Sequence, residues 1–317
     1  MIWVIGYKGM LGTEVVKQLQ EKKLSWVGTG IEVDISDYTA LESFTKSIKT
    51  ASYFPSQLSK NERQINWIIN CAAYTNVKKA EDNIEQAEKI NTFGSLNIAR
   101  ICRKIGAKLI HISTDYVFDG KSNTPYTEDE FKTPLNVYGK TKAAGEEAIQ
   151  KEMNTYYIIR TSWLYGINGN NFVKTIINKS NTEDNFSIIN DQFGTPTNAQ
   201  DLAEVIIKFI DRSVNASGFF GKNSIPAYGI YNFTNNGQTN WFEFAQEIYK
   251  LGKKYKKINN ECKITSCTSL EYNDLVIRPS YSVLDKSKIC KELKIKLVDW
   301  KVSLEKFIKS TDFSVLN

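Results

Sequence analysis

The chain has 317 residues, 24% of them charged, and its 41 basic and 35 acidic residues leave a net charge of +6. That length accommodates about two domains of ~150 residues each. The lysines are spread along the sequence rather than gathered in a basic arm, so we expect no nucleic-acid partner. No run approaches the ~18 apolar residues of a membrane span, so we expect no membrane partner either.

The cysteines and the histidine limit the chemistry. Five cysteines form no C-x-x-C pair, and the one histidine, His111, lies inside an apolar run. A zinc site therefore lacks ligands, no metal is expected, and a hydrolytic Ser-His-Asp or Cys-His set is excluded. The odd number of cysteines and the lack of a secretory segment before the first predicted strand favour reduced thiols and a cytoplasmic location.

The N-terminus has the pattern of a dinucleotide-binding turn. Residues 2–5 predict a buried strand, and a helical pattern runs to about residue 22. Between them, a glycine-rich loop lets the backbone turn sharply and approach a pyrophosphate at the start of the helix. The glycine spacing is GxxGxxG rather than GxGxxG, and an ordinary tight turn is the alternative interpretation. The residues expected at the pyrophosphate are Gly6, Gly9, Met10, Leu11 and Gly12.

Further apolar runs at 26–29, 67–71, 108–113 and 156–161 predict parallel strands covered on both faces. Helical patterns at 79–105 and 136–151 lie between them. The alternation predicts an α/β fold with a doubly wound parallel sheet of the Rossmann type. Residues 49–64 lack periodicity and predict a surface insertion.

Beyond residue 161 the alternation fades, which predicts a smaller C-terminal α/β substrate domain over the carboxyl edge of the sheet. The helical pattern at 199–212 indicates that the chain returns to the first domain. We therefore expect a dinucleotide-binding domain at 1–165 plus about 191–232, and a substrate domain at about 166–190 plus 233–317.

Three side chains suit proton transfer to a carbonyl group. Tyr138 and Lys142 are four residues apart, so on a helix they share one face. A free tyrosine has a pKa near ~10, and a neighbouring cation is expected to lower it, which makes Tyr138 a better proton donor. Thr114 adds a hydroxyl upstream. A surface helix produces the same spacing, so the pair alone does not decide.

Together, these motifs resemble the extended short-chain dehydrogenase/reductase superfamily and, within it, the dTDP-4-dehydrorhamnose reductase family. The blocks that carry the resemblance are Ser-Thr-Asp-Tyr-Val-Phe-Asp-Gly at 113–120, Asn-Val-Tyr-Gly-Lys-Thr-Lys at 136–142, Arg-Thr-Ser-Trp-Leu-Tyr at 160–165, Asn-Asp-Gln-Phe-Gly-Thr-Pro-Thr at 190–197 and Arg-Pro-Ser-Tyr-Ser at 278–282. With the glycine loop, they extend from residue 6 to about residue 285.

The resemblance implies NAD(P)H-dependent reduction of the C4 ketone of a dTDP-6-deoxy-4-keto-sugar. Tyr138 would donate a proton to the ketone oxygen, Thr114 would hydrogen-bond the same oxygen, and Lys142 would hold the nicotinamide ribose. Further cofactor contacts are expected at Thr29, Asp34, Ile35, Ala72, Ala73 and Tyr74. Substrate contacts are expected at Val77, Asp115, Tyr116, Trp163, Asn171 and Arg278.

The sequence discriminates only weakly between NADP(H) and NAD(H). The second strand ends in Thr29-Gly30, which offers neither the acidic residue typical of NAD sites nor the arginine typical of NADP sites. Lys8 in the glycine loop could reach a 2′-phosphate, which favours NADP(H) slightly and leaves NAD(H) possible.

The sequence departs from the family pattern in two places, one at the rim of the expected substrate site and one at the expected dimer contact. Lys78 follows Val77 where many members carry an aspartate. Some members form dimers around magnesium held by glutamates; Glu14 matches one such position, but Gln200 replaces a second, and an amide is a poorer ligand for this cation. We therefore expect no structural magnesium and a monomer or a weak homodimer.

Three alternatives remain. A dehydratase usually carries Asp-Glu after the catalytic threonine, and Tyr116 in place of the glutamate argues against it. A C4 epimerase, or another nucleotide-sugar 4-reductase, uses the same three side chains. A non-catalytic regulatory protein resembling the β subunit of methionine adenosyltransferase would bind a dinucleotide without turnover.

Overall fold

The structure is a computed structural model that describes residues 1–50, 64–215, 225–273 and 275–313. The insertion expected at 49–64 lies almost entirely outside the described residues.

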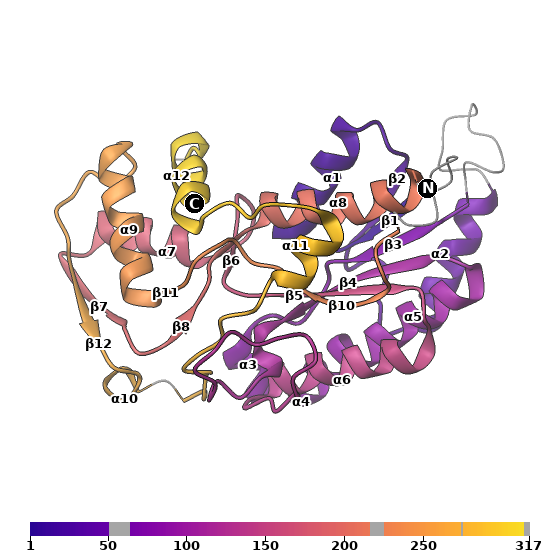
Figure 1. Ribbon diagram of the computed structural model, residues 1–317, viewed down its shortest axis with the longest axis horizontal. Coiled ribbons are helices and arrows are strands. Elements are labelled where there is room, and N and C mark those ends of the chain that lie inside the picture. The colour runs from indigo at the N-terminus through magenta and orange to yellow at the C-terminus, as the bar shows by residue number, and fades with distance from the viewer. Residues whose placement is uncertain (51–63, 216–224, 274, 314–317) are drawn as a thin grey trace.

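A six-stranded parallel sheet forms the centre of the first part of the chain (Figure 1). Its strand order is β10-β5-β4-β3-β1-β2. The strands are β1 (Ile2–Ile5), β2 (Trp26–Thr29), β3 (Trp67–Asn70), β4 (Lys108–Thr114), β5 (Tyr156–Thr161) and β10 (Gly229–Asn232). The order reverses between β1 and β3, so a crevice opens at their carboxyl ends, the usual ligand site of such sheets. The predicted doubly wound fold is confirmed.

Helices cover both faces of the sheet because the strands are apolar on both sides. On one face lie α1 (Met10–Glu21), α8 (Ala199–Asn215) and α11 (Ser287–Leu293). On the other lie α2 (Tyr38–Thr50), α5 (Gly94–Ile105) and α6 (Val137–Glu152). The helical stretch predicted at 79–105 is interrupted, with α3 (Val77–Asp82), α4 (Ile84–Glu88) and a π-helical turn, η1 (Lys89–Phe93), before α5. Each of these helices is amphipathic and turns its apolar face to the sheet.

A second hydrophobic core lies beside the sheet, at the left of Figure 1. It is built from α7 (Phe172–Thr182), α9 (Trp241–Lys254) and α12 (Trp300–Ser310), with β7 (Asn185–Ile189) paired to β12 (Lys263–Cys267). The remaining elements are η2 (Asp115–Val117), α10 (Ser269–Tyr272), β6 (Leu164–Tyr165), β8 (Phe193–Gly194), β9 (Thr197–Asn198) and β11 (Thr239–Asn240).

The division into two domains remains a proposal, and the packing suggests one amendment to it. Ile289 and Leu293 of α11 are buried in the core of the sheet, although the chain around them was assigned to the substrate domain. We propose the division given above with α11 moved to the dinucleotide-binding domain.

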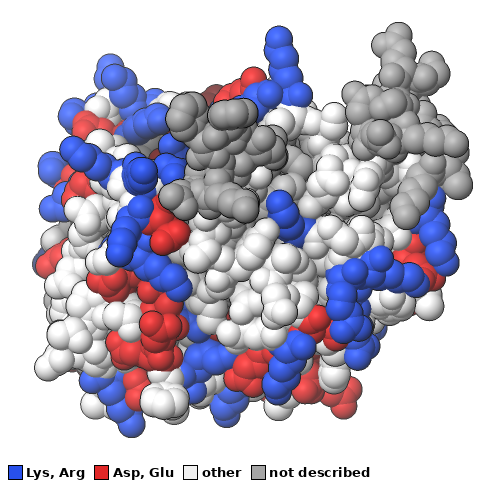
Figure 2. Space-filling view, turned by 45° about the vertical axis from the view of Figure 1, so that its right-hand side comes forward, with Lys and Arg blue, Asp and Glu red and all other residues white. Residues whose placement is uncertain are grey.

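The surface offers no field of one sign on the face seen in Figure 2, where basic and acidic side chains are interspersed. Within the part of the chain that the structure describes, no helix has the length and apolar character needed to cross a membrane.

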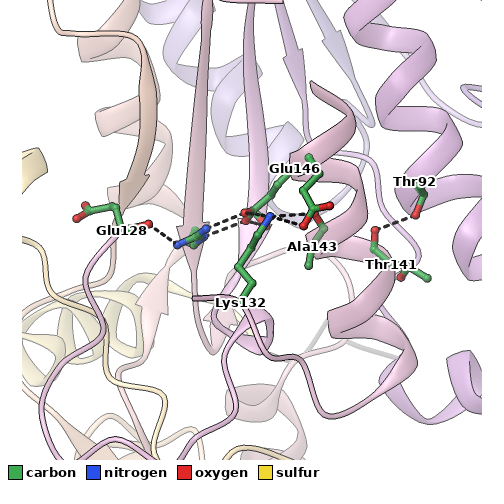
Figure 3. A network of polar contacts seen from close by, with 9 residues as sticks. Thr92, Glu128, Lys132, Thr141, Ala143 and Glu146 are labelled. Atoms are coloured by element: carbon green, nitrogen blue, oxygen red, sulfur yellow. Dashed lines mark hydrogen bonds and ion pairs between the residues drawn. The ribbon is translucent and has the colours of Figure 1, made fainter. Parts of the chain in front are cut away.

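A buried ion pair joins α6 to β5 (Figure 3). Arg160 donates from Nε and Nη2 to the two carboxylate oxygens of Glu146, at 2.9 and 2.8 Å, and both side chains are at most 1% exposed. Ser113 of β4 also donates to Glu146, at 2.6 Å, and Arg160 donates to the carbonyl oxygen of Glu128, at 3.1 Å. Burial alone would raise the pKa of Glu146, but Arg160 and Ser113 hold it below its usual value.

Replacing Arg160 tests the importance of this pair. Arg160→Met removes the cation that bonds both carboxylate oxygens of Glu146 and leaves only Lys132, 3.7 Å away, so we expect a loss of about 3–5 kcal/mol in the free energy of unfolding. The measurement is urea unfolding at pH 7. Lys179→Met is the control, because it breaks the half-exposed pair with Glu183 and should lose at most about 1 kcal/mol. Equal losses in the two variants would contradict the assignment.

Candidate active site

The glycine loop closes against the carboxyl end of β3. Gly6 has a φ of +78°, and a Cβ added there would lie 2.9 Å from the main-chain nitrogen of Ala72. A Cβ at Gly12 would lie 2.1 Å from the carbonyl oxygen of Gly6. The loop is pinned by a 2.7 Å hydrogen bond from the Gly6 amide to the carbonyl of Thr29. No side chain caps the start of α1 at Gly9, so the amides of its first turn suit a pyrophosphate.

Gly12→Ala tests the loop. The added methyl group requires the Gly6 carbonyl to move, so we expect NADPH affinity to fall at least ~10-fold. Gly9→Ala is the matched control, since its Cβ would meet the Gly6 carbonyl at 3.2 Å and needs only a small adjustment. The measurement is NADPH fluorescence titration, with circular dichroism to check folding. A smaller effect at Gly12 than at Gly9 would refute this account of the loop.

The end of β2 differs from the expectation. The hydroxyl of Thr29 accepts a 2.9 Å hydrogen bond from the indole of Trp3, and Thr29 is 2% exposed, so its side chain faces the core rather than the crevice. The exposed group here is Glu32, whose carboxylate accepts from the Gly30 amide at 2.6 Å. Glu32 was not predicted as a site residue, although an acidic residue shortly after the second strand is a known signal.

Asp34 and Ile35 form the next turn. Asp34 accepts hydrogen bonds from the amide and hydroxyl of Ser36, at 2.9 and 2.6 Å, and these bonds lower its pKa. Ile35 is buried, and its Cδ1 lies 2.8 Å from a Cβ built at Gly94 on α5. Both residues therefore have structural partners, and contact with an adenine remains a proposal.

The segment after β3 is fixed by Asn91, a buried residue of η1 that the sequence analysis missed. Its side chain exchanges hydrogen bonds with the main chain of Tyr74, at 2.9 and 3.1 Å, and donates to the hydroxyl of Thr141 on α6, at 3.0 Å. Ala72 and Ala73 lie on the strand side of this link. The expected ribose-side wall is thus tied to the helix that carries Tyr138.

Thr114 and Tyr138 meet at the carboxyl edge of the sheet. Thr114 ends β4, and its hydroxyl lies beside the phenol of Tyr138. Asn136 caps α6 by accepting from the Gly139 amide at 2.9 Å, which sets where the helix begins. The ring of Tyr116 packs edge-on to that of Tyr138, with centroids 5.7 Å apart. The structure therefore brings together the predicted proton donor and its hydroxyl partner.

The lysine acts differently from the expectation. The Nζ of Lys142 donates to the carbonyl of Ile112 at 2.6 Å, and burial lowers its pKa to about 8. Burial raises the pKa of Tyr138 above its usual value, although the nearby hydroxyl of Thr114 opposes the rise. The expected lowering of the tyrosine pKa by Lys142 is not found. Tyr138 is therefore a phenol that holds its proton at neutral pH.

Asp115 is the other titratable group beside Thr114. Its carboxylate accepts from the Thr114 hydroxyl at 3.0 Å, and it is 2% exposed. Burial raises its pKa to about 6, although the nearby hydroxyls of Thr114 and Ser282 oppose the rise. The fold thus disfavours the charged form of this carboxyl.

Asp115→Asn should therefore stabilise the protein at pH 8. A folded-state pKa of about 6 lies above the value of ~3.9 expected on unfolding. The stability contributed by the protonated form is complete below pH ~4 and is lost as the pH rises through the folded value. The neutral amide removes that loss, so we expect a gain of up to about 3 kcal/mol at pH 8 and none at pH 4. Urea unfolding at the two pH values checks this; a gain of the same size at both would argue against it.

The predicted substrate residues lie around this edge. Arg278 donates to the hydroxyl of Tyr116 at 3.1 Å, which joins two of them. Trp163 has a φ of +47°, rare for a bulky residue, and its ring stacks on Trp241 with centroids 3.7 Å apart. A Cβ at Gly194 would lie 2.6 Å from the Trp163 ring, so this indole is held tightly.

Asn171 and Val77 are less clearly placed for a ligand. Asn171 caps α7, accepting from the Lys174 amide at 3.2 Å and donating to the carbonyl of Gly166 at 2.8 Å. Val77 is half-buried at the start of α3, with Lys78 exposed beside it. A diphosphate site shared by Asn171 and Arg278 therefore remains a proposal.

Comparison with known proteins identifies the family. A family model described as the RmlD substrate binding domain matches residues 1–313. The chain belongs to the dTDP-4-dehydrorhamnose reductase family. It is 34% identical over 308 residues to the spore coat polysaccharide biosynthesis protein SpsK of Bacillus subtilis, covering 97% of this chain and 96% of that protein.

Two solved structures of dTDP-4-dehydrorhamnose reductases are also similar. That from Clostridium acetobutylicum is 38% identical, with a TM-score of 0.83 over 97% of this chain and 98% of the other. That from Bacillus anthracis, in complex with NADP, is 31% identical, with a TM-score of 0.84 over 98% and 99%.

Glu14 and Gln200 occupy the two positions considered for a structural magnesium. Glu14 is buried, which raises its pKa, and Gln200 donates to Glu204 at 3.5 Å. In the described ranges, no group of three or more His, Cys, Asp or Glu side chains is arranged to hold a metal ion.

Proposed function

We propose that the chain reduces the C4 ketone of dTDP-4-dehydro-L-rhamnose to the hydroxyl of dTDP-L-rhamnose, with hydride from a nicotinamide dinucleotide. The observation that carries the proposal is the position of the Thr114 hydroxyl beside the phenol of Tyr138 at the carboxyl edge of the sheet, in a chain of this reductase family. A ketone becomes a hydroxyl only if a proton reaches its oxygen, and Tyr138 holds that proton.

The glycine loop fits a dinucleotide. Glycine at positions 6 and 12 permits the tight turn, because a Cβ at either would collide with the main chain of Ala72 or Gly6, and the first turn of α1 offers amide donors. When bound, the cofactor supplies the hydride. NADPH is slightly favoured and NADH is possible. Lys8 would attract the 2′-phosphate of NADPH, whereas the neighbouring carboxylate of Glu32 would repel it, so the two side chains together permit either cofactor.

Each side chain of the catalytic set has a distinct task. Tyr138 gives its phenolic proton to the ketone oxygen as negative charge develops there. Thr114 hydrogen-bonds the same oxygen and keeps Tyr138 in place. Lys142 returns a proton to Tyr138 for the next turnover.

The nucleotide sugar is expected to lie over this edge. Arg278 suits a diphosphate because a guanidinium binds two phosphate oxygens at once. Trp163 and Tyr116 form aromatic walls for the sugar ring, and Asp115 accepts from a sugar hydroxyl. We further propose a role in cell-surface polysaccharide synthesis, a cytoplasmic location, and a monomer or weak homodimer.

Tyr138→Phe tests the reaction. The variant lacks the proton donor, so we expect turnover to fall at least ~100-fold while NADPH affinity is unchanged. The measurement is NADPH oxidation with dTDP-4-dehydro-L-rhamnose, with product identified by chromatography. Tyr249→Phe, which loses a hydroxyl bonded to Glu261 far from this edge, is the control and should keep full turnover.

Near wild-type turnover of Tyr138→Phe would overturn the proposal. The wild-type assay also separates the alternatives, because an epimerase consumes no NADPH in net terms and a regulatory subunit produces no turnover.

A further inference from the structure

The one histidine of the chain lies beneath the catalytic edge and has no part in the reaction described above. His111 belongs to β4 and is 1% exposed. Its Nδ1 lies 3.0 Å from the side-chain nitrogen, Nδ2, of Asn70, and its Nε2 lies 3.3 Å from the Nζ of Lys142. A polar chain therefore runs from β3 through β4 to α6.

The position of the imidazole proton follows from the main chain. The Asn70 side-chain oxygen accepts from the amide of Ala72 at 3.1 Å, which fixes the orientation of the side-chain amide, because a main-chain N–H can only donate. The NH₂ group of Asn70 then faces Nδ1 of His111 and also only donates, so Nδ1 must accept. Burial keeps the imidazole neutral by lowering its pKa well below the usual value. The proton is therefore on Nε2.

This tautomer has a consequence for Lys142. An ammonium group has no lone pair and cannot accept from Nε2–H, whereas a neutral amine can. The neutral amine would donate to the carbonyl of Ile112 and accept from His111. Each polar atom along the Asn70–His111–Lys142 series would then have a partner. The charged form instead meets an N–H that points at it.

Two titratable side chains lie around Lys142. His111 faces it from β4, and Glu146, one turn further along α6, raises its pKa. That carboxylate is already paired with Arg160 of β5 and lies 3.7 Å from Lys132. On the other side, Asp115 of η2 acts on Tyr138.

We propose that His111, oriented by Asn70, is a positioning residue that donates its Nε2–H to Lys142 and stabilises the neutral amine left when Lys142 gives up its proton. This inference rests on the proposed reductase function. After Tyr138 has protonated the product oxygen, an Nζ–H bond of Lys142, one turn along the same face of α6, breaks, and its proton replaces the one that the phenolate oxygen of Tyr138 has lost. The electron pair stays on Nζ and accepts the hydrogen bond from His111. Solvent water then returns a proton to Lys142.

The tautomer can be observed directly because the chain has one histidine. In the full chain without a histidine tag, labelled with ¹⁵N-histidine, two-dimensional NMR of the ring nitrogens should show Nε2–H and unprotonated Nδ1 between pH 6 and 9. An Nδ1–H tautomer or an imidazolium would overturn the inference. Because this experiment needs no turnover, its failure is distinct from failure of the reductase assay.

Asn70→Asp should reverse the tautomer. A carboxylate accepts both from the Ala72 amide and from Nδ1–H, so the imidazole proton moves to Nδ1 and Nε2 then accepts from the ammonium of Lys142. We expect the NMR pattern to switch to Nδ1–H. Retention of Nε2–H in this variant would contradict the role given to Asn70.

Substitution of His111 tests the effect on turnover. His111→Leu removes the donor to Lys142, so we expect kcat to fall about fivefold to tenfold, the effect of one hydrogen bond, with KM for both substrates unchanged. The loss of activity at alkaline pH, where Lys142 is deprotonated, should move to higher pH. His111→Gln keeps an N–H donor and should restore most of kcat.

Ile110→Val on the same strand controls for loss of packing, and we expect it to leave both kcat and the pH profile unchanged. An unchanged kcat and pH profile in His111→Leu, or no rescue by His111→Gln, would overturn the proposal.

Discussion

The buried pair of Glu146 and Arg160 holds α6, the helix that carries Tyr138, in place. It fixes α6 against β5 and, through Ser113, against β4. Tyr138, Lys142 and Glu146 are spaced four residues apart, so they lie along one face of α6. Because removing one partner of such a pair leaves an uncompensated charge, rotation of α6 is resisted, and the phenol of Tyr138 stays beside Thr114.

The other wall of the site is attached to the same helix. Asn91 in η1 bonds both the main chain of Tyr74 after β3 and the hydroxyl of Thr141 on α6. The glycine loop packs against Ala72 in turn. Cofactor loop, strand edge and proton donor are thus connected by short contacts across the point where the strand order reverses, and a shift in one of them would be transmitted to the others.

Local pattern predicted most of this framework. The second strand, residues 26–29, was placed correctly because it is a continuous apolar run, and the spacing of Tyr138 and Lys142 implied one helix face. Contacts between distant segments were not predictable in this way. The hydroxyl of Thr29 turns to Trp3 only because β1 pairs with β2 in a particular register, and Asn70 meets His111 only because β3 pairs with β4 in one. The interruption of the helix at η1, which supplies Asn91, has no periodic signal either.

The departure at Tyr138 and Lys142 has a chemical meaning. A neighbouring cation that lowered the tyrosine pKa strongly would leave part of the protein as phenolate, which cannot donate a proton. Burial does the reverse, keeping Tyr138 protonated and making Lys142 release its proton more readily. Reduction needs a protonated tyrosine at the moment the hydride arrives, and a nearby group that returns a proton to it afterwards. Oxidation in the opposite direction would need the phenolate, which this environment disfavours at neutral pH.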